Sequence, residues 1–200
     1  MAAPLSMGRL SSDMSPVVIV VLLTLLLGIQ PVATDLYLPA LPTLQHELGA
    51  GIAPAQLTLS ALIIAFGVSQ LIAGPLSDRF GRRPVLLWGT ALYTIACTGG
   101  ALAPDIEWLI AWRALQGVAI ATAVTSGRSV VRDLFRPIDG AKTMSRALGG
   151  LGVIAMVAPL VGGLLVHLLG WRSALAAPAL FGAATFGFVA WKFIETIPVR

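Results

Sequence analysis

Long apolar stretches recur along this chain, separated by short polar segments. Charge-free windows occupy 14–34, 48–77, 84–104, 147–171 and 173–191, and a sixth apolar window at 108–128 has Arg113 in its interior. A helix rises about 1.5 Å per residue, so about 20 residues cross the roughly 30 Å hydrocarbon core of a bilayer. The windows are continuously apolar and do not alternate in polarity, which favours spanning helices over the strands of a lipid-facing barrel.

The windows predict an all-α integral membrane protein with six transmembrane helices. We place these helices at 16–38, 56–77, 84–104, 107–129, 147–168 and 173–193. The predicted organisation is a cytoplasmic tail at 1–15, a six-helix bundle at 16–193 and a cytoplasmic end at 194–200. Arg9 ahead of the first apolar run also suits a secretory signal. That run is long and five more follow it, so a spanning helix is favoured.

The distribution of Lys and Arg predicts the orientation of the helices. If the N-terminus lies inside, all of the 13 basic residues except Arg113 and Arg172 fall in cytoplasmic segments or tails. Cytoplasmic loops of membrane proteins carry such an excess of basic residues. Trp108 and Trp171 fall near the outer interface and are expected to anchor the helices there. Both termini are therefore expected in the cytoplasm.

The composition agrees with a membrane protein and excludes other classes. Hydrophobic residues make up 57% of the chain and charged residues 11%, whereas soluble domains carry about 25% charged residues. The net charge of +4 would suit a nucleic-acid-binding protein, but the basic residues lie between apolar runs. Cys97 is the only cysteine and lies in an apolar run, so neither a disulfide framework nor a metal cluster is expected. His46 and His167 are isolated, and no enzyme chemistry is predicted.

Two charged residues, Asp35 and Arg113, fall within predicted membrane helices. A charge near the centre of such a helix costs about 2.5–3.5 kcal/mol on insertion scales, so both are candidate functional residues. Both are expected in the outer half of the membrane, at similar depth, where they can face one water-filled cavity. Thr24, Gln30 and Gln116 lie near them along their helices and are candidate cavity-lining residues.

A carboxylate in a poorly solvated cavity can take up a proton from one side and release it after the cavity has turned to the other. A substrate that competes for Asp35 or Arg113 would thereby be coupled to the proton. Both residues are therefore candidates for proton and substrate coupling. Two simpler interpretations stay open: Asp35 emerges into the outer headgroup region, or Arg113 extends its side chain to the outer surface.

A short polar segment between the second and third predicted helices combines a carboxylate with closely spaced arginines. It reads Gly-Pro-Leu-Ser-Asp-Arg-Phe-Gly-Arg-Arg-Pro over 74–84. Asp78 can neutralise a helix end, and Gly74 can allow a neighbouring helix to approach. The arginines alone would suit a positive-inside anchor, but the whole spaced pattern, with a carboxylate four residues ahead of a double Arg, indicates a charge latch.

This segment resembles the loop motif of the major facilitator superfamily, Gly-x-Leu-x-Asp-Arg-x-Gly-Arg-Arg. The matching residues are Gly74, Leu76, Asp78, Arg79, Gly81, Arg82 and Arg83. A second segment, with Arg113, Gln116 and Gly117, is similar to the helix 4 motif of that superfamily, whose Arg is implicated in proton coupling. A third resembles the antiporter motif that kinks and packs helix 5; its residues are Pro159, Gly162 and Gly163, with Ala158 where Gly is frequent.

The segment 33–42 resembles the end of helix 1 in the bicyclomycin and chloramphenicol resistance (Bcr/CflA) group of drug exporters. The resemblance covers essentially the whole chain and implies the six-helix N-terminal half of a major facilitator fold, a 3+3 repeat. It also implies a secondary active transporter of the inner membrane that exports drugs or other small amphipathic compounds. Export would be driven by the proton gradient, with no cofactor.

Members of this superfamily have two six-helix halves, so the resemblance implies a partner for this chain. A fragment, a truncated product or a split gene product is favoured, which leaves a missing C-terminal half. Pairing with a second copy is the other option. Membrane lipid and a drug-like small molecule are further expected partners, and nucleic acid is not. Two alternatives stay open: transport of another solute on the same fold, and a non-transporting remnant or helper subunit.

Overall fold

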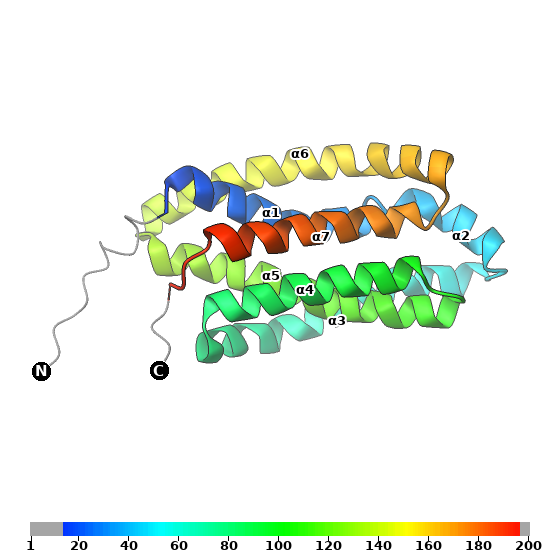
Figure 1. Ribbon diagram of the computed structural model, residues 1–200, viewed down its shortest axis with the longest axis horizontal. Helices are drawn as coiled ribbons and strands as arrows, with labels where there is room; N and C mark the ends of the chain where they lie inside the picture. The colour runs from blue at the N-terminus through cyan, green and yellow to red at the C-terminus, as the bar shows by residue number, and fades with distance from the viewer. Residues whose placement is uncertain (1–13, 197–200) are drawn as a thin grey trace, which may run out of the picture.

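The computed structural model describes residues 14–196 as a bundle of long helices that lie side by side (Figure 1). The elements are α1 (Pro16–Thr34), η2 (Leu38–Ala40), α2 (Leu41–Glu47), α3 (Ile52–Phe80), α4 (Arg82–Ala101), α5 (Ile106–Leu134), α6 (Pro137–Leu169) and α7 (Ser173–Lys192). Within 14–196 no strand is present. The all-α prediction with six long helices is therefore confirmed.

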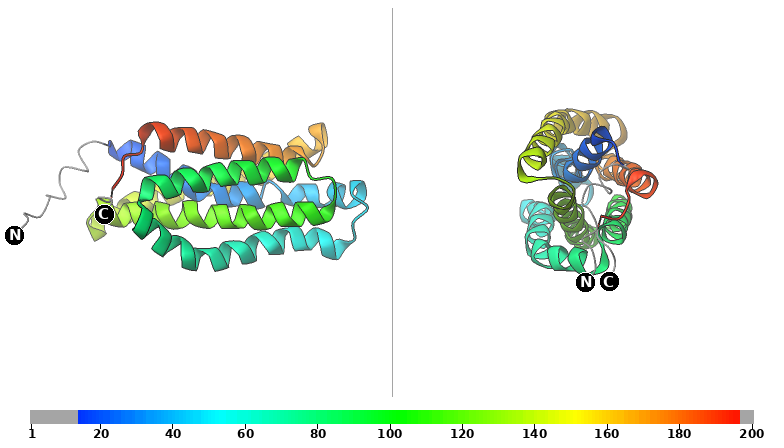
Figure 2. Two further views of the ribbon diagram at one scale, coloured as in Figure 1. Left: turned by 60° about the horizontal axis from the view of Figure 1, so that its bottom comes forward. Right: turned by 90° about the vertical axis from the view of Figure 1, so that its left-hand side faces the viewer.

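Five segments are long and apolar enough to cross a membrane: Pro16–Glu47, which holds α1 and α2, and the helices α3, α5, α6 and α7. The remaining long helix, α4, has 20 residues but carries several Gly and Thr among its apolar positions. It packs against α5 and α7 over their length, as Figure 2 shows. The start of α1 and the end of α7 lie at the same end of the bundle (Figure 1), as an even number of passes requires.

We term this end, where the α3–α4 and α5–α6 turns also lie, the latch end, and the opposite end the α2 end. Local sequence explains several helix boundaries. Ser15 accepts a hydrogen bond from the Val18 amide and caps α1, and Asp105 caps α5 in the same way. Gly81 and Gly170 take positive φ angles of 92° and 80° at the ends of α3 and α6, a conformation that glycine adopts most readily.

Several predicted boundaries differ from the structure: α3 begins at Ile52 and not at 56, and α5 ends at Leu134 and not at 129. Two further differences have a clear local cause. The first helix ends at Thr34 and not at 38, because Pro39 lacks the amide proton that would continue the helical hydrogen bonds. The fifth long helix begins at Pro137 and not at 147. Proline suits the first turn of a helix, and polar residues there can continue the helix outside the apolar layer. An apolar window marks only the part of a helix that lies in lipid.

Burial differs among the long helices. In α1 and α5, 50% and 56% of the most apolar window is buried inside the bundle, against 17% in α3 and 11% in α6. Small residues bring some helices very close together: a Cβ atom on Gly117 of α5 would collide with the Leu62 carbonyl of α3. Because so little of α3 and α6 is buried, these two helices present broad apolar faces outward, with Leu71 79% exposed and Leu160 73% exposed.

Trp171, in the turn between α6 and α7, closes the α2 end of the bundle. It is fully buried, so the prediction that it anchors the chain at an interface was wrong. Its indole Nε1 donates to Glu47 Oε2 at 3.0 Å, and Arg172 lies over its ring at 4.6 Å. Together with Leu44 and Tyr37 it belongs to one buried cluster, which packs the short helix α2 onto the bundle.

Candidate transport site and latch

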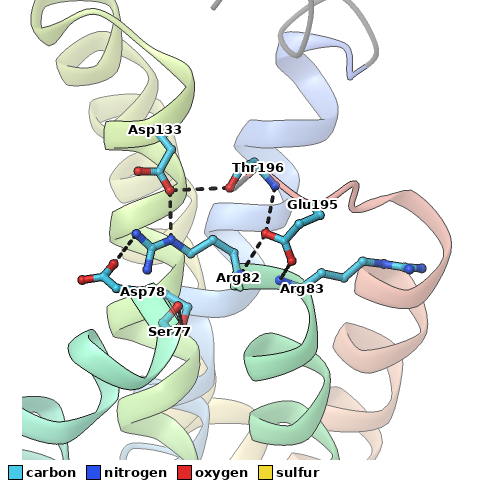
Figure 3. Close-up of polar contacts among 8 residues, drawn as sticks. Ser77, Asp78, Arg82, Arg83, Asp133, Glu195 and Thr196 are labelled. Atoms are coloured by element: carbon cyan, nitrogen blue, oxygen red, sulfur yellow. Dashed lines mark hydrogen bonds and ion pairs between the residues drawn. The ribbon is translucent and has the colours of Figure 1, made fainter. Parts of the chain in front are cut away.

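Arg82 is the centre of a polar network at the latch end (Figure 3). Its guanidinium Nη2 pairs with Asp78 Oδ1 at 2.5 Å, and its Nε donates to Asp133 Oδ2 at 2.9 Å. The Arg82 side chain is only 2% exposed, whereas that of Asp78 is 56% exposed and that of Asp133 is 19% exposed. The network thus joins the end of α3, the start of α4 and the end of α5 through one buried cation.

The charge of Arg82 is held by this network. Burial lowers the pKa of Arg82, but hydrogen bonds and charge from Asp133 and Asp78 raise it more, so that it ends above its usual value. The residue lies ahead of the apolar window that begins at Pro84. Arg82 therefore stays cationic, and its Nη1 is buried without a hydrogen-bond partner in the described part of the chain.

Glu195 completes this site, and the sequence analysis missed it. Its two carboxylate oxygens accept hydrogen bonds from the backbone amides of Arg82 and Arg83, each at 2.9 Å. These amides begin α4, where helical donors have no intrahelical partner and a negative charge is favoured. The next residue, Thr196, contacts the same Asp133 Oδ2 atom as Arg82, at 3.5 Å (Figure 3). The segment that follows α7 thus binds the predicted latch.

The other predicted latch residues have separate surroundings. Arg79 lies over the Phe80 ring at 5.5 Å, and Arg83 donates from Nη2 to the Ala190 carbonyl at 3.0 Å. Gly81 has a positive φ, and a Cβ atom there would lie 2.7 Å from Glu195 Oε2. At Gly74 a Cβ atom would make only ordinary contact with α5, so close approach of a helix does not require glycine at this position.

Arg113 is fully buried in the first third of α5 (Ile106–Leu134), although it is charged. Its Nη1 donates to the backbone carbonyl of Ala33 at 3.0 Å and to Gln116 Oε1 at 2.6 Å. Its guanidinium lies over the Tyr37 ring, 4.2 Å from the centroid. The two remaining nitrogens, Nε and Nη2, have no hydrogen-bond partner among residues 14–196. The side chain therefore does not extend to the outer surface.

Asp35 does not pair with this arginine, although residues near Asp35 along the chain contact it. The residues two before and two after it, Ala33 and Tyr37, both contact Arg113. The Asp35 side chain is half-buried and accepts a hydrogen bond from the Thr34 hydroxyl at 2.8 Å. Of the ion pairs formed by described residues, none includes Asp35. Asp35 thus lies between two residues that contact Arg113, while its own carboxylate forms no ion pair with that arginine.

A buried polar chain extends from Arg113 into the neighbouring helices. Gln116 is fully buried and donates from Nε2 to Cys97 Sγ at 2.8 Å, so it supports Arg113 and does not face an open cavity. The Tyr37 and Thr58 hydroxyls lie 2.9 Å apart and join the end of α1 to α3. The sequence analysis did not select Tyr37 or Cys97. The only available signal for Tyr37 and Cys97 was that a polar side chain occurs within an apolar stretch.

The remaining candidates lie along α1 and α6. Thr24 is half-buried and contacts α6, where its hydroxyl donates to the Ala147 carbonyl at 3.4 Å. Gln30 is exposed. Pro159 lies within the continuous helix α6. At Gly162 a Cβ atom would collide with the Leu36 backbone, whereas nothing lies within 4 Å of one at Gly163. Only the first of this glycine pair lies in a close helix contact.

The sequence of this chain matches a known protein family and several of its members. The sequence model of the Major Facilitator Superfamily matches residues 5–200. The chain is 38% identical over 160 residues to a chloramphenicol resistance protein of Pseudomonas aeruginosa, which covers 80% of this chain and 38% of that protein. It is 33% identical over 182 residues to multidrug resistance protein D of Escherichia coli (strain K12), covering 90% of this chain and 46% of that protein. The chain therefore spans less than half of these relatives.

A solved structure of the peptide transporter POT in complex with sulfate has a similar fold. The TM-score is 0.79 at 17% sequence identity, and the alignment covers 94% of this chain and 41% of that one. At this identity the likeness concerns the arrangement of helices alone.

Proposed function

Because this chain belongs to the major facilitator superfamily, we propose that it forms the N-terminal six-helix half of a transporter that exports drug-like compounds in exchange for protons. Relatives 38% and 33% identical are named for chloramphenicol and multidrug resistance, which supports drug export. The proposal places the protein in the inner membrane with both termini in the cytoplasm. The excess of Lys and Arg at the latch end supports this orientation.

The observation that carries the proposal is that Arg113 contacts the residues on both sides of Asp35. Arg113 contacts Ala33 and Tyr37, so a change of charge at Asp35 acts on a cation held two residues away on either side. Two of its nitrogens lack partners, which makes a new acceptor at this site favourable. In the proposed cycle Asp35 carries the proton, and Arg113 responds by a change in how it holds the end of α1.

The latch would govern the alternation between the two open states. Its buried cation, Arg82, is shared by three helix ends, so the helices cannot separate there without exposing or unpairing it. Removing one partner from a buried charge is costly. The network is therefore expected to be either fully formed or fully broken. The proposed latch therefore holds the transporter in one of its two open states until substrate or proton binding offsets the free-energy cost of breaking the Arg82 network.

A second six-helix bundle is part of the proposal. The outward faces of α3 and α6 are apolar and little covered, in contrast to α1 and α5. The relatives are more than twice as long as the matched segment. A C-terminal half, or else a second copy of this chain, would cover these faces.

Export by everted membrane vesicles of a strain without its own drug exporters tests this function. The chain is expressed with its natural flanking sequence, and uptake of chloramphenicol is followed after a pH gradient is imposed. We expect Asp35→Asn to abolish uphill uptake, because the neutral amide cannot carry a proton. Asp105→Asn is the matched control, because this acid caps α5 at the α2 end. Uphill uptake that survives Asp35→Asn would overturn the coupling role.

A further inference from the structure

Two adjoining cavities lie beside the end of α5, apart from the network around Arg82. The larger has a volume of about 460 Å³ and the smaller about 210 Å³, and both are lined by Arg128 and Arg132. Pockets for small ligands measure about 300–1,000 Å³, so the larger cavity alone is of ligand size. The smaller adds Gln70, Thr125 and Ser129 from α3 and α5. We term the two together the basic groove.

Three arginines converge on this groove without partners of their own. Arg128 and Arg132 are one helical turn apart and share a face of α5, and Arg136 follows at the start of α6. All three are exposed. Among residues 14–196, none of their side chains has a hydrogen bond, ion pair or ring contact. The adjacent carboxylate, Asp133, is engaged with Arg82.

Other basic residues at the same end behave differently. Arg79 and Lys192 lie over aromatic rings, and Arg83 donates to a backbone carbonyl. Orientation in the membrane explains how many basic residues this end carries, but not why unpartnered ones line a cavity. Lys142 and Arg146 on α6 also lack partners, yet they line neither cavity. They provide a matched control for the effect of charge alone.

The lining of the groove defines the chemistry that it can bind. One wall of the larger cavity is apolar, with Val131, Phe135 and Met144. The planar guanidinium group of arginine matches the oxygens of phosphate and carboxylate groups and can bind them in a bidentate manner. Guanidinium groups beside an apolar wall suit an anion attached to an apolar body, and they repel a cation of the same shape.

We propose that the basic groove binds an amphipathic anion, with Arg128 and Arg132 on its phosphate or carboxylate and the apolar wall against its body. Two sources offer this chemistry: a phospholipid headgroup of the surrounding leaflet, and a free anionic solute that enters the cavity. As an entry site for solutes, the groove rests on the proposed transport function. Binding of the anion itself does not.

Native mass spectrometry of the purified chain in neutral detergent tests the binding. The probes are dodecyl phosphate, the matched cation dodecyltrimethylammonium, and inorganic phosphate. The test variant combines Arg128→Ser and Arg132→Ser, and the control combines Lys142→Ser and Arg146→Ser, with the same loss of charge. We expect dodecyl phosphate to bind the parent more tightly than either other probe. Its affinity should fall about tenfold or more in the test variant and little in the control.

Competition with phosphatidylglycerol distinguishes the two sources. If the lipid displaces dodecyl phosphate from the parent but not from the test variant, the natural ligand is a headgroup; if it does not, the ligand is a solute. Equal losses in the test and control variants, or equal binding of the cation, would overturn the proposal. Export of chloramphenicol by the same variants is a separate readout. Failure of export with intact binding would count against the transport function alone.

Discussion

Arg113 donates a hydrogen bond from Nη1 to the backbone carbonyl of Ala33 at 3.0 Å, and this contact fastens the end of α1 to α5. The last carbonyls of a helix have no intrahelical donor, and a cation near them is favoured by the helix dipole. Arg113 therefore caps α1 just ahead of Asp35. The cap is incomplete, because two nitrogens of the buried guanidinium remain without partners.

This incomplete pairing predicts an inverse relation between stability and function at Arg113. Burying a lone charge carries a large desolvation cost, and the two hydrogen bonds from Arg113 Nη1 offset only part of it. We expect Arg113→Met to unfold at the same temperature as the parent or higher, and to lose proton-driven export. Arg113→Ala should unfold at a lower temperature because it leaves a cavity. Labelling of the single buried Cys97 by a thiol-reactive dye during heating reports unfolding. A Met variant less stable than the Ala variant would contradict this account.

The adjacent glycines of α6 predict opposite effects of the same substitution. Gly162→Ala places a methyl group against the Leu36 backbone and must move α6 away from the end of α1, at a cost of about 1–3 kcal/mol. Gly163→Ala meets open space and should stabilise α6 by up to about 1 kcal/mol, because alanine favours the helix. Unfolding temperatures of the two variants check this, and equal shifts would exclude the close contact.

Comparing alanine substitutions at Gly81 and Gly170 measures how much of the loss in stability at Gly81 comes from Glu195. Alanine at either position meets a similar penalty for this backbone conformation, about 1–3 kcal/mol. Only at Gly81 does the methyl group also displace the Glu195 carboxylate. We expect Gly81→Ala to destabilise more than Gly170→Ala, and the difference to shrink when Glu195→Ala is combined with each. A difference that persists in the double variants would show that the carboxylate is not responsible.

The two carboxylates around Arg82 should contribute unequally to stability. Asp133 is mostly buried, so Asp133→Asn leaves the buried guanidinium with only the exposed Asp78 as a partner charge, at a cost of about 1–3 kcal/mol. Asp78 is more than half exposed, and water and salt screen it, so Asp78→Asn should cost less than about 1 kcal/mol. Unfolding at low and high salt measures both variants, with the Asp78 effect vanishing in high salt. The reverse order would require a different arrangement of the network.

The membrane passes could be predicted because each depends on a local stretch of sequence. The windows around α3, α4 and α7 lie within a few residues of the observed helices. The misplaced boundaries, at Thr34 and Pro137, lie where helices pass out of the apolar layer and hydropathy no longer marks them. The pairing of Asp78 with Arg82 was also accessible, because a spacing of four residues leaves only a short turn between them.

The rest of the site could not be predicted from local patterns. Glu195 lies 113 residues from Arg82 along the chain, and its position after a hydrophobic helix indicates only a polar tail. Trp171 has the sequence surroundings of an interfacial anchor, yet it is fully buried against Glu47. In both cases the partner comes from a distant element that packs nearby.

By itself the sequence determined that this is an all-α, multi-pass membrane protein with six long helices, and that it carries Asp35, Arg113 and the latch arginines. A spanning helix must satisfy its own backbone and present about 20 apolar residues, and both conditions are local. Only the tertiary structure decided that Arg113 caps α1 without pairing with Asp35, and that Glu195 binds the start of α4. These contacts depend on how packed helices rotate and tilt against one another, which side-chain volume and close packing determine jointly across the bundle.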